Sequence, residues 1–123
     1  MEKPLSPHLQ IYKPQITSMS SITHRITMIF IGFSLFIWTF FLYKLSIGGG
    51  EFRQCLSYFN TFFGKTYLII LCFCLTYHFL NGIRHIFWDF GIGFDLCISK
   101  TISWGIFAIS ILFSIIVTWR LFS

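Results

Sequence analysis

Four ionisable side chains stand close together at the end of an otherwise apolar segment, residues 78–91 (HFLNGIRHIFWDFG). Each such group costs a few kcal/mol in hydrocarbon unless it is paired or takes part in a function, so we expect this segment to be functional. On a helix, His78, Gly82 and His85 share one face, with the two histidines about two turns, or roughly 10 Å, apart. An imidazole beside a glycine gap suits a flat, bulky ligand, and haem is the ligand that the pattern favours.

A haem iron in an electron-transfer cytochrome takes a second axial ligand from the opposite face of the ring. His78 and His85 project from the same side of one helix, so they cannot hold one iron between them. His24 lies at the entrance of an earlier apolar segment, and counting residues along the two helices predicts that it differs in depth from His78. We therefore predict that His78 is the axial ligand from this chain and that another chain supplies the second.

Two neighbours of His78 extend this prediction. Arg84 and His85 lie one to two turns nearer the membrane surface, where haem propionates emerge, and cationic groups bind carboxylates. For His78 itself the alternative is an ordinary interhelical hydrogen bond. Trp88 is interpreted as a residue of the interfacial aromatic belt, and Asp89 as the partner of Arg84 or of another chain.

A second concentration of polar residues occupies positions 18–25 (SMSSITHR), where Thr17 or Ser18 is expected to cap a helix. On that helix Ser21 and Arg25 stand at i and i+4, on one face. A hydroxyl and a guanidinium can hydrogen-bond a carbonyl oxygen and stabilise negative charge on it, which suits the head of a lipid-soluble quinone. The alternative, which the spacing alone favours, is a capped helix whose arginine reaches lipid phosphates.

The composition bounds the elements that position these residues. Of 123 residues, 55% are hydrophobic and 11% are charged, which is too apolar for a soluble domain of this size. Three windows lack Lys, Arg, Asp and Glu: 26–43, 66–83 and 101–119. We predict an all-α membrane protein of one anchor domain, residues 1–123. The predicted parts are an N-terminal segment 1–20 and transmembrane helices at about 21–44, 65–89 and 98–122.

The remaining segments are read as connections. The first connection contains three consecutive glycines and is predicted to be flexible, and Gly91 and Gly93 predict turns in the second. The first 25 residues lack the pattern of a signal or transit peptide, so we expect synthesis in the compartment of insertion. The nine basic residues divide five to four between the two sides, a weak preference for an inside N-terminus. The net charge of +5 fits anionic lipid headgroups, and we expect no nucleic-acid partner.

Two motifs carry a resemblance to a known family. The first is PLSPHLQIY at 4–12, followed by SITHRIT at 21–27, and the second is H-x-x-x-G-I-R-H-x-x-W-D-x-G at 78–91. Over nearly its whole length the chain resembles the cytochrome b556 large membrane-anchor subunits of succinate dehydrogenase (complex II, succinate:quinone oxidoreductase). One position departs from the family pattern, because Met28 stands where glycine is usual. Gly32, one turn later, is expected to provide the close helix contact instead.

The resemblance implies specific roles and partners. Such subunits pair with a second small membrane-anchor subunit and bind one haem b between them, beside an iron-sulfur subunit and a flavoprotein subunit. It implies that His78 is an axial ligand and that Ser21 and Arg25 belong to the ubiquinone site. From its place one turn after His78, we expect Gly82 to pack on the haem. We add His24 to Arg84 and His85 as candidate residues around the haem. The N-terminal segment is expected to pack beneath the iron-sulfur subunit, on the cytoplasmic or matrix side.

The leading hypothesis is an electron-transfer subunit that passes electrons from succinate to ubiquinone, in the tricarboxylic acid cycle and respiratory chain. It has no catalytic domain of its own and lies in a bacterial cytoplasmic (inner) membrane or a mitochondrial inner membrane. The alternatives are a purely structural anchor, the anchor of a fumarate reductase, and a transporter subunit whose histidines relay protons. The last is disfavoured because only His78 lies deep and no acidic residue falls within a span.

Overall fold

The computed structural model describes residues 15–123, and within that range the chain folds into helices joined by short turns, without strands. In chain order the helices are α1 (Ile16–Ile47), α2 (Gly50–Phe59), α3 (Phe62–Asp89) and α4 (Leu96–Phe122). Three of them, α1, α3 and α4, are long and apolar enough to cross a membrane. This confirms the prediction of an all-α chain with three spans. The motif at 4–12 lies outside the described residues.

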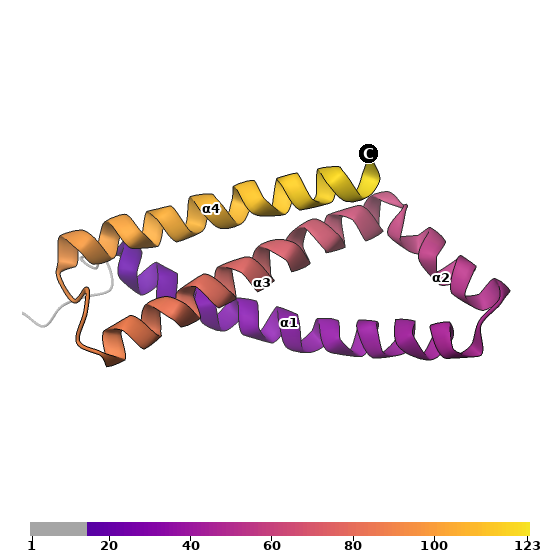
Figure 1. Ribbon diagram of the computed structural model, residues 1–123, viewed down its shortest axis with the longest axis horizontal. Coiled ribbons are helices and arrows are strands. Elements are labelled where there is room, and N and C mark those ends of the chain that lie inside the picture. Colours follow the sequence, from indigo (N-terminus) through magenta and orange to yellow (C-terminus); the bar gives the residue numbers. More distant parts are fainter. Residues whose placement is uncertain (1–14) are drawn as a thin grey trace, which may run out of the picture.

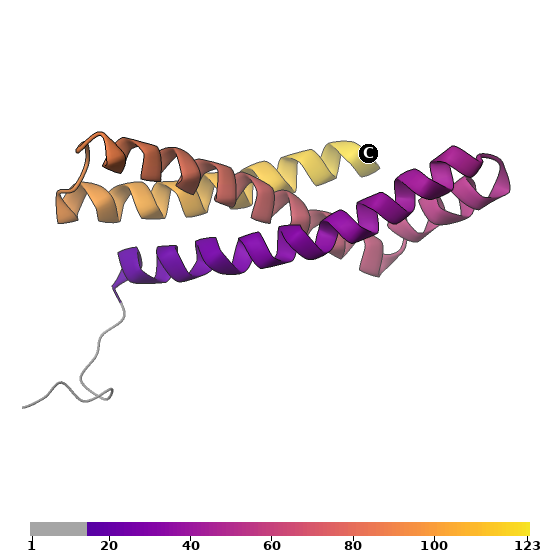
Figure 2. The same ribbon diagram turned by 90° about the horizontal axis from the view of Figure 1, so that it is seen from below.

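The three long helices run in alternating directions (Figure 1). Helix α3 packs against both α1 and α4, which contact each other less. The start of α1, the end of α3 and the start of α4 meet at one end of the molecule, at the left of Figure 1. Towards the other end α1 and α3 diverge, and α2 connects them there (Figures 1 and 2). The two polar sequence motifs therefore fall at the same end, which we call the convergent end.

The first helix begins earlier than predicted. Gln15 is the N-cap residue with an extended backbone and makes no side-chain capping hydrogen bond, so the expectation of a cap at Thr17 or Ser18 is wrong. The added turn places Ile16 beside α4, where it lines a small cavity together with Trp104. Partial burial of this apolar side chain explains why the helix begins before the hydroxyl residues, because packing outweighs local capping preference.

The predicted flexible connection between the first two spans is mostly helical. Gly48 and Gly49 have positive φ angles of 75° and 69° and form the turn, but the chain then enters α2. Phe52 and Phe59 of this helix pack on Phe41 of α1, and their ring centroids lie 5.3 and 5.5 Å, respectively, from that of Phe41. These aromatic contacts, and not the three glycines, determine the structure of the connection and hold α2 against α1.

The second connection follows its glycine signals. Gly91 and Gly93 both have positive φ angles, 77° and 85°, which side chains with a Cβ rarely adopt. The indole Nε1 of Trp88 donates a hydrogen bond to the Gly93 carbonyl at 3.3 Å and closes the turn. Asp95 then caps α4 by accepting from the Cys97 amide at 2.9 Å.

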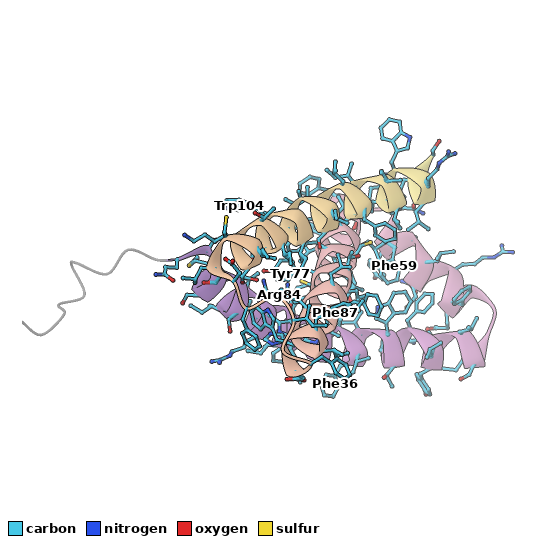
Figure 3. The ribbon with its side chains drawn as sticks, turned by 60° about the vertical axis from the view of Figure 1, so that its left-hand side comes forward. Phe36, Phe59, Tyr77, Arg84, Phe87 and Trp104 are labelled. Carbon is cyan, nitrogen blue, oxygen red and sulfur yellow. The ribbon has the colours of Figure 1, made fainter. Side chains whose placement is uncertain are left out.

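The outer surface is apolar, whereas much of the interior is small and polar. Large side chains such as Phe36 and Trp104 are 76% and 60% exposed, and Phe36 points away from the other helices (Figure 3). Outward apolar side chains and inward small ones are the distribution of a membrane bundle. The close contact expected at Gly32 is not found, because a Cβ there would meet no atom within 4 Å.

Candidate functional site

Three imidazoles come together at the convergent end. The ring of His24 in α1 lies 4.2 Å from that of His78 in α3, centroid to centroid, with 33° between the planes. It also stacks on His85, at 5.4 Å and 23°. Since one ring of α1 contacts both, His78 and His85 share a face of α3, as their spacing predicts. We call these three residues the histidine cluster.

The predicted difference in depth between His24 and His78 is wrong. His24 lies 24 − 16 = 8 residues after the start of α1, and His78 lies 89 − 78 = 11 residues before the end of α3. At 1.5 Å per residue, His24 and His78 lie about 12 and 17 Å from the convergent end. The two depths are similar enough for the rings to meet where the helices cross. Rings in contact leave no space for a macrocycle, so in this arrangement the two histidines cannot bind one iron from opposite sides.

Thr27, one turn after His24, also faces His78 and is only 2% exposed. Its hydroxyl donates to the His24 carbonyl oxygen at 2.7 Å. The same Oγ1 lies 3.3 Å from Nδ1 of His78. The side chain thus joins the backbone of α1 to the ring on α3.

A buried hydrogen-bond network lies beside the cluster and was not anticipated from the sequence. The Tyr77 hydroxyl donates to Ser20 Oγ at 3.1 Å, and Ser20 Oγ donates to Asn81 Oδ1 at 3.2 Å. Asn81 in turn donates from Nδ2 to the Tyr77 carbonyl at 3.1 Å. All three side chains are buried, and Asn81 is 0% exposed. Tyr77 and Asn81 are four residues apart on α3, and this spacing is the signal that could have placed both at one interface.

Arg84 turns towards α4 rather than towards the histidine cluster. Its Nη1 donates to Ser103 Oγ at 2.6 Å, and its guanidinium lies 4.6 Å from the Trp88 ring centroid. The side chain is 4% exposed, and Nε and Nη2 are buried without a hydrogen-bond partner in the described part of the chain. It sits between the helices near Tyr77 (Figure 3). The expected pairing of Arg84 with Asp89 is therefore not found.

The two predicted quinone residues lie one turn apart on α1, on either side of His24 in the chain. Ser21 is half-buried and Arg25 is exposed. Within residues 15–123 neither side chain makes a hydrogen bond to another residue, so the hydroxyl and the guanidinium both remain available to a ligand or another chain. It is the preceding serine, Ser20, that turns inward.

Gly82 leaves open space on α3 between the two cluster histidines of that helix. A Cβ built there would meet no atom within 4 Å. Among the described residues no group of three or more His, Cys, Asp or Glu side chains is arranged to hold a metal ion. An iron bound here would need most of its ligands from outside the chain, as a haem supplies them. One imidazole with open space one turn along fits that requirement.

Comparison with known proteins gives the context for this geometry. Residues 1–117 match the family described as the succinate dehydrogenase/fumarate reductase transmembrane subunit. The chain belongs to this family. A succinate dehydrogenase cytochrome b556 subunit from Rickettsia bellii is 39% identical over 117 residues, which are 94% of this chain and 90% of the relative. The cytochrome b560 subunit of Marchantia polymorpha is 39% identical over 112 residues, 86% of this chain and 80% of the relative.

Membership of the succinate dehydrogenase/fumarate reductase family agrees with the three candidate spans. A further relative, the cytochrome b560 subunit of Reclinomonas americana, is 33% identical over 78% of this chain and 70% of its own length. The chain is thus a multi-pass membrane-anchor subunit of the succinate dehydrogenase type, and the resemblance drawn from its two motifs is confirmed.

Proposed function

We propose that this subunit holds haem b through His78 and contributes Ser21 and Arg25 to a ubiquinone-reduction site. The observation that carries the proposal is that both sets of residues converge at one end of the bundle. His78 lies beside the open space at Gly82, and Ser21 and Arg25 have hydrogen-bond donors that no described residue uses. Relatives that carry the name cytochrome b556 or b560 support the cofactor assignment.

His78 would supply one axial imidazole, and a histidine of a second membrane-anchor subunit the other. Contact between the rings of His24 and His78 speaks against His24 as the opposite ligand. His24 and His85 then lie around the haem edge, while Arg84 is held against α4 by Ser103 and reaches the haem only if that contact opens. Bound haem supplies a one-electron carrier next to the quinone site.

At the quinone site the chain's own residues act as hydrogen-bond donors. The Ser21 hydroxyl and the Arg25 guanidinium would bind a carbonyl oxygen of the ubiquinone head and stabilise negative charge as electrons arrive. The electrons would come from succinate through the flavin and iron-sulfur centres of partner subunits. The N-terminus would then lie on the cytoplasmic or matrix side, where those partners dock. A fumarate reductase would use the same residues in the opposite direction.

The haem assignment is tested on the complex purified with its partner subunits, by dithionite-reduced minus oxidised spectra. We expect a b-type α-band that His78→Ala abolishes, because half of the axial ligation is lost. His85→Ala is the matched control, since it removes an imidazole from the same cluster and should keep the band. Retention of the band in His78→Ala would reject His78 as a ligand, and a haem-free but active wild-type complex would favour a purely structural anchor.

The quinone assignment is tested by two activity assays on the same membranes. Arg25→Ala should lower succinate-dependent ubiquinone reduction by about ten- to a hundredfold, the loss of one charged hydrogen bond. Succinate oxidation by a water-soluble artificial acceptor should remain. Arg53→Ala is the control, because Arg53 is an exposed arginine on α2 at the far end of the bundle. Equal loss of both activities in Arg25→Ala would mean defective assembly and would count against a role in quinone binding.

A further inference from the structure

The contacts of Thr27 fix which nitrogen of His78 carries a proton. A threonine hydroxyl has one hydrogen and can accept through its lone pairs. Oγ1 lies 2.7 Å from the His24 carbonyl oxygen, which can only accept, so the hydroxyl hydrogen points there. Towards Nδ1 of His78, at 3.3 Å, Thr27 is left only with the role of acceptor. Nδ1 of His78 must therefore carry the hydrogen of this bond.

A neutral imidazole protonated on Nδ1 has its lone pair on Nε2. Thr27 is 2% exposed, so water does not compete for Nδ1 from the side of the hydroxyl. The arrangement therefore selects one tautomer of His78 before any ligand binds. It also restrains rotation of the ring, because turning it would leave the Nδ1 hydrogen without this acceptor.

We infer that Thr27 is a positioning residue for the axial ligand: it holds His78 in the Nδ1–H tautomer and leaves Nε2 to bind the haem iron. This inference rests on the proposed function of His78. A hydrogen bond from the far nitrogen also raises the basicity of a metal-bound imidazole. A more basic ligand favours ferric over ferrous iron, so the Thr27 contact lowers the midpoint potential of the haem.

Two other hydroxyl residues of α1, the buried Ser34 and the exposed Thr39, do not share this arrangement. Ser34 donates to the Phe30 carbonyl and Thr39 to the Leu35 carbonyl, each four residues back in the same helix. Thr27 instead bonds three residues back, to His24, and uses its remaining acceptor capacity across the helix interface. Thr39 is exposed and provides a matched control for loss of a threonine hydroxyl from α1.

The test is a redox titration of the haem in the assembled complex, with haem content as a second readout. Thr27→Val replaces the hydroxyl by a methyl group of similar shape. We expect a positive shift of the midpoint potential and haem binding weakened by about 10–100-fold, the usual effect of losing such a partner. Thr27→Ser keeps the hydroxyl and should behave as the wild type, as should Thr39→Val.

The outcomes separate this inference from the proposed function. Loss of haem from His78→Ala together with an unchanged potential and haem content in Thr27→Val would overturn the role of Thr27 and leave His78 as the ligand. A shift in Thr27→Ser as large as in Thr27→Val would mean that the potential does not follow the hydroxyl, and this would also overturn the inference. If Thr27→Val does not assemble, Thr27→Ala is measured in its place. Failure of both to assemble would assign the hydroxyl to folding instead.

Discussion

Helix α3 meets α1 and α4 through two interfaces of different chemistry. Towards α1, side chains bond to side chains of the other helix, as in Tyr77 to Ser20 and Ser20 to Asn81. Towards α4, the buried residues are mostly small hydroxyl side chains that donate to carbonyls of their own helix, including Ser110 to Ile106 at 2.7 Å. The interface with α1 fixes positions through specific bonds. Apart from the bond of Arg84 to Ser103, the interface with α4 allows close approach through small side chains.

The difference predicts opposite sensitivities. The hydroxyl residues of α4 recur at nearly every turn, on the side that faces α3: Ser99, Ser103, Ser110, Ser114 and Thr118. Most of these hydroxyls donate to carbonyls of α4 itself and act as small spacers, so changes of size should matter at these positions more than changes of polarity. Ser103 is the exception, because its Oγ also accepts a hydrogen bond from Arg84 of α3. At the interface with α1, by contrast, loss of a polar atom should matter even when volume is kept. The histidine cluster lies at the interface between α1 and α3, which depends on specific bonds.

The largest effect is expected from Ser110→Leu, because Ser110 is 0% exposed and a leucine would force α3 and α4 apart. Overpacking of this kind costs about 1–3 kcal/mol. Thermal inactivation of the complex in detergent, followed as residual assembled fraction, measures it. Ser110→Ala is the matched control and should be close to the wild type. An alanine variant as unstable as the leucine variant would show that the hydroxyl, not its size, holds this interface.

A smaller effect is expected at the interface with α1, where a double-mutant cycle joins Ser20→Ala and Asn81→Ala. The two side chains share a bond of 3.2 Å, so their effects on stability should not add. We expect a coupling of about 0.6 kcal/mol, the average for polar pairs between membrane helices. Pairing Ser20→Ala with Ser110→Ala should give no coupling, since these residues share no bond. Additive effects in the first cycle would remove the basis for treating this interface as specific.

Tyr77→Phe should be milder, because the ring remains packed. The ring of Tyr77 stacks near Phe73 at 5.5 Å and meets Phe107 edge-on at 6.1 Å, and neither contact uses the hydroxyl. Only the bonds to Ser20 are lost, for which we expect less than about 1 kcal/mol. Tyr77→Leu, which also removes the ring, should be clearly worse in the same thermal assay. Equal effects of the two variants would mean that the hydroxyl bond dominates.

The sequence predicted the three spans, the glycine turn and the shared face of His78 and His85, because helical periodicity and hydropathy act within one segment. It did not predict that Thr27 and Asn81 meet partners on another helix, since periodicity says nothing of which helix a face will contact. The error over the depth of His24 has a related cause. Packing of Ile16 against α4 extends α1 by five residues that the sequence assigned to the N-terminal segment. Helix α2 was missed because its glycine-rich start outweighed an amphipathic pattern of only ten residues.

The smallest effect is expected at the far end of the bundle, where Glu51 of α2 pairs with Lys44 at 2.6 Å. The hydrogen bond from Lys44 lowers the pKa of the Glu51 carboxyl from its ordinary value of 4.5. A lowered pKa in the folded state means stabilisation that is present above pH 4.5 and disappears as the pH falls through the folded value. The pair is exposed and screened by solvent, so Glu51→Gln should hardly alter thermal stability at neutral pH. Thermal scans of wild type and Glu51→Gln from neutral pH to below pH 4 should converge at the acidic end. A large difference at neutral pH would show that this end, too, depends on a specific bond, which would remove the contrast with the histidine cluster.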